Sequence, residues 1–182
     1  MRLSACWRRL DLPGHDTALL LPDNDGWRLA GTAAFRDPAG PACVHYTVEL
    51  DRGWQAQQGR VHGHVGGKTF DHRLERSGSG WSLDGRRVAG TEGLVDLDYG
   101  FTPATNLLAL RRAGPPIGAA AELPAAWFQL ETRTLTALPQ RYQRLDATRY
   151  RYDAPSVGFA TTLVFDGDGF VRDYPPLWMM QD

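Results

Sequence analysis

Short runs of alternating apolar and polar residues, separated by turn residues, recur along most of this chain. In residues 27–35 the odd positions are mostly apolar, and in residues 44–50 the even positions are. A period of two residues places such side chains on one face of a strand, so these two runs predict neighbouring antiparallel strands. Similar runs occupy residues 54–65, 68–76, 81–84, 126–135, 141–145, 148–152, 158–166 and 170–174.

The connections between these runs are short and rich in glycine. Gly66–Gly67, Asp84–Gly85 and Asp166–Gly167 are dipeptides that suit the tight turns of β-hairpins. An open sheet of about ten or more strands must curl or split. We therefore predict an all-β, mainly antiparallel fold: a strongly curved sheet or barrel-like meander that forms a single domain over residues 1–182. The pattern leaves open whether the interior is filled or hollow.

Composition and charge exclude several classes of partner. The formal net charge is −1, from 20 basic and 21 acidic residues that are interspersed, which is not the footprint of a nucleic-acid partner. No segment has the length and apolar character of a transmembrane segment, and the first residues lack the apolar run of a secretion signal. Cys6 and Cys43 stand outside any C-x-x-C pattern, so we expect both to be reduced in a cytoplasmic protein. The sequence leaves the oligomeric state open.

One segment, residues 94–112, combines strand and helix signals. It begins with apolar residues that alternate with aspartates, and it continues into Thr102–Pro103, a pair typical of a helix start. Three leucines follow, and Gly114 with two prolines ends the segment. This order predicts a strand followed by one short helix.

The charges of this segment have two interpretations. Asp96 and Asp98 could lie on the exposed face of a strand, with Arg111 and Arg112 as ordinary cations at a helix C-terminus. Alternatively, some of them point into a cleft and orient a polar ligand group. An inward carboxylate needs a cation, because burying an unpaired charge is too costly, and the two arginines are its nearest candidates in sequence.

A second polar group lies in residues 140–153. Tyr142 and Arg144 precede Tyr150 and Tyr152, and the latter two share one strand face while the arginines beside them share the other. Cross-strand pairing on a solvated sheet explains this pattern. A ligand-binding lining of tyrosine and arginine explains it as well, because both side chains join apolar surface to polar groups.

Signals for metal binding and catalysis are weak. His62 and His64 would share a strand face, with His72 across a hairpin, but no carboxylate follows at a ligand spacing. The serines lie outside any G-x-S-x-G motif, and the cysteines have no visible partner base. We therefore expect no metal, no cofactor and no identified catalytic residue, while Asp96 or Asp98 could still serve as an acid or base.

Several short motifs together resemble a known family. They are D-L-D at residues 96–98, F-T-P at 101–103, T-N at 105–106, L-R-R at 110–112, Q-R-Y at 140–142, Y-R-Y at 150–152, D-G-F-V at 168–171 and D-Y-P at 173–175. In this order and spacing they resemble the bacterial putative glycolipid-binding family, formerly a domain of unknown function. The resemblance implies a compact all-β fold wrapped partly around a helix, and a cytoplasmic protein that binds a glycolipid or related amphiphile in an apolar cavity. It supplies no catalytic residues.

These observations lead to one main hypothesis and two alternatives. The main hypothesis is a non-catalytic protein that binds a glycolipid-like amphiphilic small molecule. Its expected ligand-binding residues are Asp96, Asp98, Arg111, Arg112, Tyr142 and Arg144. The first alternative is a small hydrolase-type enzyme that acts on a sugar or lipid head group through Asp96 or Asp98. The second is a structural module with a solid interior, which the lack of any cavity near ~300 Å³ would favour.

Overall fold

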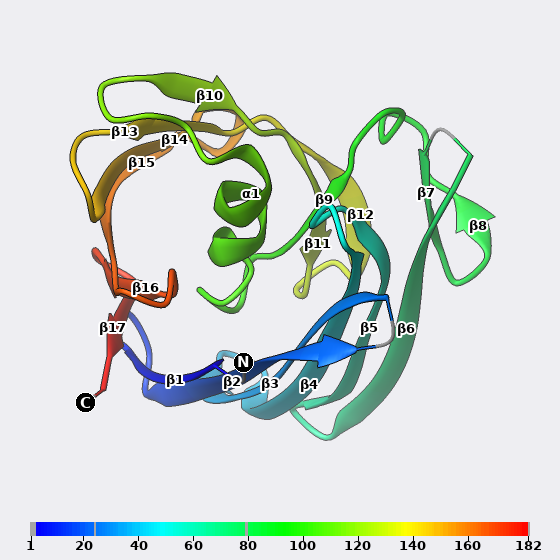
Figure 1. Ribbon diagram of the computed structural model, residues 1–182. Coiled ribbons are helices and arrows are strands. Elements are labelled where there is room, and N and C mark those ends of the chain that lie inside the picture. Colours follow the sequence, from blue (N-terminus) through cyan, green and yellow to red (C-terminus); the bar gives the residue numbers. More distant parts are fainter. Residues whose placement is uncertain (1–2, 24, 79, 182) are drawn as a thin grey trace.

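The computed structural model describes residues 3–23, 25–78 and 80–181 as strands that curve around an α-helix (Figure 1). The strands are β1 Leu3–Arg9, β2 Gly14–Asp23, β3 Gly26–Asp37, β4 Gly40–Asp51, β5 Ala56–Val65, β6 Lys68–Ser77, β7 Gly80–Leu83, β8 Arg86–Arg87, β9 Asp96–Tyr99, β10 Ala120–Glu122, β11 Ala125–Gln129, β12 Thr134–Leu138, β13 Arg141–Arg144, β14 Arg149–Ala154, β15 Phe159–Phe165, β16 Val171–Tyr174 and β17 Trp178–Met180. The helices are α1 Asn106–Ala113 and the short 3-10 helix η1 Pro155–Val157. None of the helices in these ranges has the length and apolar character needed to span a membrane.

The strands form one large and one small sheet. The large sheet has 14 strands in the order β10-β13-β14-β15-β16-β17-β1-β2-β3-β4-β5-β6-β7-β8, and the small one has the order β12-β11-β9. All neighbours are antiparallel except β9 and β11, which are parallel. The predicted all-β, mainly antiparallel fold is therefore confirmed. The barrel description was too specific, because the sheet curls strongly but does not close: β10 and β8 remain at its two edges.

Strand positions follow the alternation where that alternation is strong. β3 and β4 pair with Leu29 opposite Val48, and both side chains are fully buried on the inner face. The run at residues 126–135 was wrongly predicted as one strand. It is divided between β11 and β12 by a turn in which Arg133 adopts a positive φ of 55°. The strands β1, β2, β8, β10 and β17 were missed.

The concave side of the sheet is filled rather than hollow. Two clusters of buried residues occupy it, one around Trp7, Tyr46 and Phe128 and the other around Tyr142 and Leu163. Helix α1 lies within the curve, as Figure 1 shows, and supplies residues to both clusters. The helix therefore replaces the open interior that a sheet of this size would otherwise enclose.

Helix α1 begins later than the sequence predicted. Its first residue is Asn106, with Thr105 at the N-cap, instead of the Thr102–Pro103 pair. The Thr102 hydroxyl still accepts a hydrogen bond from the N–H of Ala104 at 3.0 Å, as a capping side chain does, and it also donates to the buried carboxylate of Asp16.

The predicted end of the helix is confirmed. Gly114 adopts the left-handed conformation with φ 50°, and its N–H donates to the carbonyl of Leu110 at 2.9 Å. Arg111 and Arg112 occupy the last turn, where the helix dipole favours cations.

Candidate ligand-binding site

A pocket with a volume of about 240 Å³ lies between the N-terminal end of α1 and the strands β9, β11, β14, β16 and β17. We call it the aromatic pocket. Six aromatic residues line it together with a smaller set of polar ones. The aromatic residues are Tyr99, Trp127, Tyr152, Phe159, Tyr174 and Trp178, and the polar ones include Asp98, Thr102 and Asn106.

Asp98 reaches this pocket because β9 alternates its side chains between two faces. Leu97 and Tyr99 are buried in the main core, so Asp96 and Asp98 lie on the opposite face. The Thr105 hydroxyl donates to Oδ1 of Asp98 at 2.7 Å. Burial raises the pKa of Asp98, and the hydrogen bond from Thr105 opposes this rise only in part. The pocket therefore contains a carboxyl group that accepts protons more readily than a surface aspartate does.

Asn106 stands at the first position of α1 and presents its side chain to the same pocket. Its amide Nδ2 donates to the hydroxyl oxygen of Tyr142 at 2.8 Å. The Tyr142 hydroxyl in turn donates to Oε1 of Gln140 at 3.3 Å. Tyr142 is only 1% exposed and stands behind Asn106, so this predicted ligand-binding residue positions a pocket residue.

Two tyrosines add hydroxyl groups to the aromatic wall. Tyr152 and Tyr174 lie edge to face, with ring centroids 6.2 Å apart. Burial raises the pKa of both phenols above the usual range. Both hydroxyls therefore stay protonated at neutral pH and can donate as well as accept hydrogen bonds.

Asp96 and Arg112 form a pair with each other and do not line the aromatic pocket. Nε of Arg112 lies 2.9 Å from Oδ1 of Asp96, and Nη2 lies 2.6 Å from Oδ2. The two side chains are 3% and 25% exposed, respectively. Hydrogen bonding to Asp96 raises the pKa of Arg112. This bidentate pair joins the start of β9 to the end of α1 and thereby fixes the helix beside the pocket.

Arg111 and Arg144 line a second pocket, of about 210 Å³, beside the C-terminal half of α1. Arg111 donates to the carbonyl of Asp168, and its guanidinium lies 5.5 Å from the ring centre of Trp54. Arg144 donates to three backbone carbonyls, one of them that of Pro115 at 3.2 Å. Both arginines thus hold loops in place.

The six predicted residues are therefore distributed over three places, and of these six Asp98 alone lines the aromatic pocket.

A buried carboxylate that the sequence did not reveal lies directly behind the aromatic pocket. Asp16 on β2 is 1% exposed, and it accepts hydrogen bonds from the hydroxyls of Thr102 and Tyr46, the latter at 2.9 Å. Burial raises the pKa of Asp16 to about 7, and these hydrogen bonds oppose the rise. The alternation of β2 could have indicated this burial, because Asp16 lies on the same strand face as Ala18 and Leu20, both of which are buried.

The histidines do not converge. His62 lies on the outer face of β5, where its ring packs against His45 with centroids 5.1 Å apart. His72 lies on the inner side of β6 beside Phe128 and bonds to Asp84 at 2.8 Å. Among the residues that the structure describes, no three His, Cys, Asp or Glu side chains are arranged to hold a metal ion.

A strongly curved antiparallel sheet around one helix, with an aromatic pocket beside that helix, places the chain among all-β proteins with a small pocket. The chain belongs to the family described as putative glycolipid-binding, whose model matches residues 4–179. It is also similar to a solved structure, the crystal structure of a DUF1089 family protein from Pseudomonas aeruginosa. The two are 27% identical with a TM-score of 0.78, over 90% of this chain and 91% of that one. No curated protein matches this chain.

Proposed function

We propose that this protein binds a glycolipid or a related amphiphile and that its head group enters the aromatic pocket. The observation that carries the proposal is the combination of Asp98 and Asn106 with six aromatic residues in one pocket. A sugar ring has apolar C–H faces and a polar hydroxyl rim. Aromatic rings suit the faces, while a carboxylate, an amide and phenol hydroxyls suit the rim.

The size of the pocket limits what it can enclose. Its volume of about 240 Å³ is below the range of about 300 to 1,000 Å³ that is typical of sites for drug-sized ligands. Only part of a glycolipid fits, and we place a sugar unit there. The acyl chains would then extend past Val157 and Leu177 on the pocket wall, since Val157 is 49% exposed and the sheet interior is already filled.

We propose the bacterial cytoplasm as the location of the protein. Both Cys6 and Cys43 are free, as is usual in a reducing compartment. The similar solved structure comes from a bacterium. Cell fractionation of a bacterium that carries the gene, with immunodetection of the protein, tests this location.

A hydrolase that acts through Asp98 is a second candidate function. The raised pKa of this carboxyl in a pocket is the property expected of a general acid. Glycosidases ordinarily need two carboxyl groups beside the bond they cleave, and Asp96 is held by Arg112. Binding without turnover is therefore our first choice. An Asp98→Asn variant that still binds a glycolipid but no longer cleaves it would reverse this order.

Fluorescence titration tests the binding proposal, because Trp127 and Trp178 line the pocket. Short-chain glycolipid probes should change the tryptophan emission of the protein at micromolar concentration. Asp98→Asn keeps an oxygen for the Thr105 hydrogen bond but removes the charge, and it should weaken binding about tenfold.

Two matched variants serve as controls. Glu131→Gln removes one carboxylate from an exposed turn, and Trp27→Phe alters a tryptophan that stacks on Trp54 away from the pocket. Both should bind as the unchanged protein does, whereas Trp127→Phe should weaken binding. No uptake of any glycolipid or acyl-chain probe at micromolar concentration would refute the proposal.

A further inference from the structure

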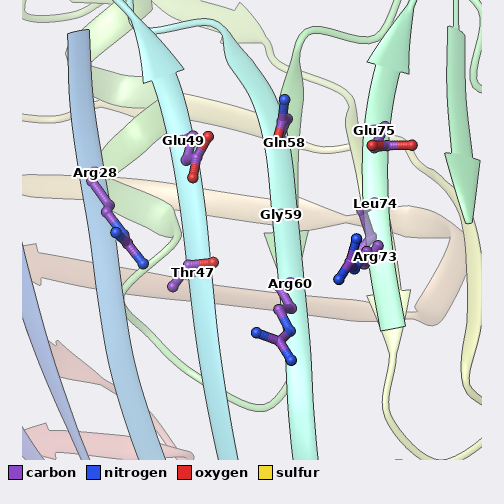
Figure 2. Close-up of a pocket in the computed structure, with 9 residues that line it drawn as sticks. All are labelled: Arg28, Thr47, Glu49, Gln58, Gly59, Arg60, Arg73, Leu74 and Glu75. Atoms are coloured by element: carbon purple, nitrogen blue, oxygen red, sulfur yellow. The ribbon is translucent and has the colours of Figure 1, made fainter. Parts of the chain in front are cut away.

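The outer face of the sheet carries a groove of about 270 Å³ over strands β3 to β6 (Figure 2). It lies on the opposite side of the sheet from the filled interior, since the inner neighbours of its residues, such as Leu29 and Val48, are fully buried. We propose that this groove binds a small zwitterion that carries a phosphate or similar anionic group at one end and an ammonium group at the other.

Strand register arranges the groove in two rows. In one row Glu49 lies opposite Gln58, and Gln58 lies opposite Glu75. In the next row Thr47 lies opposite Arg60, and Arg60 lies opposite Arg73. The groove is therefore acidic in one row and basic in the other.

Arg28 adds a third guanidinium to the basic row. Its backbone pairs with Glu49, but Figure 2 shows that its side chain extends along the strand toward Thr47. Nε of Arg28 is shielded from solvent and has no hydrogen-bond partner among the described residues. A bound anion would supply the acceptor that this buried donor lacks.

Most charged side chains of the groove form no ion pair with any residue that the structure describes. Arg60 forms a bidentate pair with Asp71 at 2.8 and 2.6 Å. Within the described part of the chain, the other four charged residues of the groove form no ion pair. These residues are Arg28, Glu49, Arg73 and Glu75. Like charges directly opposite each other on a sheet are unfavourable, as for Arg60 and Arg73. Asp71 interacts favourably with both arginines and offsets part of this repulsion, and a bound anion would offset more of it.

The spacing of the rows selects the ligand. Guanidinium groups bind phosphate through paired hydrogen bonds, and carboxylates attract an ammonium group. The rows are two residues apart on each strand, which is about 7 Å. A single anion would leave the glutamates unsatisfied, whereas a zwitterion of head-group size satisfies both rows. Such a group could be free or part of a lipid, and the two sources share this chemistry.

Calorimetric titration of the intact protein tests the inference with three probes: O-phosphoethanolamine, inorganic phosphate and ethanolamine. O-phosphoethanolamine should bind most tightly, and added salt should weaken its binding because the groove is open to solvent. Co-sedimentation with phosphatidylethanolamine vesicles then separates the sources. Binding of the free probe alone indicates a soluble ligand, and binding of the vesicles as well indicates a lipid head group. Both results support the zwitterion site.

Variants locate the binding. Arg28→Gln and Arg73→Gln should each weaken the binding of O-phosphoethanolamine about tenfold. Glu75→Gln should weaken the binding of O-phosphoethanolamine but not the binding of phosphate. Arg36→Gln is the matched control, because Arg36 is exposed at the far end of the same outer face of β3. The Arg36→Gln variant should bind O-phosphoethanolamine as tightly as the unchanged protein does.

Three results would overturn the inference: no binding at about 10 mM probe, phosphate binding as tightly as the zwitterion, or an equal loss in Arg36→Gln and Arg28→Gln. The aromatic pocket lies across the sheet, so glycolipid binding should be unaffected in all four variants. Failure of this site is therefore distinguishable from failure of the proposed function.

Discussion

Removal of either member of the Asp96–Arg112 pair should reveal how much the pair stabilises the fold. Breaking a buried ion pair costs about 3 to 5 kcal/mol, whereas an exposed pair contributes at most about 1 kcal/mol. The Asp96 side chain is 3% exposed, so Arg112→Ala leaves a buried carboxylate without its cation and should cost about 3 kcal/mol or more. Asp96→Ala should cost less, about 2 kcal/mol, because Arg112 is 25% exposed and its charge can reach water.

Urea unfolding of both single variants and the double variant gives the coupling energy of the pair. The Arg60–Asp71 pair is the matched control, since it has the same bidentate geometry but its side chains are 46% and 50% exposed. Its coupling should stay below about 1 kcal/mol. Equal and small losses for both pairs would refute the reasoning that burial makes the Asp96–Arg112 pair important.

Three further predictions concern other parts of the molecule. The folded pKa of Asp16, about 7, lies above its ordinary value of 3.8, so the stability associated with the protonated form is fully present below about pH 4 and is lost as pH rises through 7. Urea melts should show this loss, on the order of a few kcal/mol, and Asp16→Asn should abolish it. Gly59→Ala should destabilise the protein by about 1 to 3 kcal/mol, because its Cβ would lie 2.2 Å from the Tyr99 hydroxyl. Leu107→Ala, at a position 1% exposed, should cost about 2 to 5 kcal/mol in the same assay.

The sequence predicted those parts of the fold that depend on local patterns. Alternation identified the paired strands β3 and β4, since one buried face fixes both strand positions and register. Glycine and the paired arginines identified the end of α1. The single-domain prediction for residues 1–182 rests on length, and one cooperative transition in urea would support it.

Contacts between distant segments could not be predicted from local patterns. Thr102 has the signature of a helix start, yet its hydroxyl bonds to Asp16, which is 86 residues away in the chain. Arg111 and Arg112 are equivalent in sequence. However, successive helix residues point about 100° apart, so Arg112 reaches Asp96 while Arg111 reaches the carbonyl of Asp168. The structure therefore contains the expected pair of an inward carboxylate and an arginine, but it separates the other residues of the predicted site, whose role in ligand binding stays a prediction.

Native mass spectrometry of the protein purified from its own host tests the central claim, binding of an amphiphile head group in the aromatic pocket, most directly. We predict a bound species that organic extraction releases and that carries both a sugar and an acyl chain. The Asp98→Asn/Trp127→Phe double variant should lose this species, and Glu131→Gln should retain it. The claim would be contradicted by a ligand-free protein that also fails to take up added glycolipid, or by a bound species that the double variant retains in full.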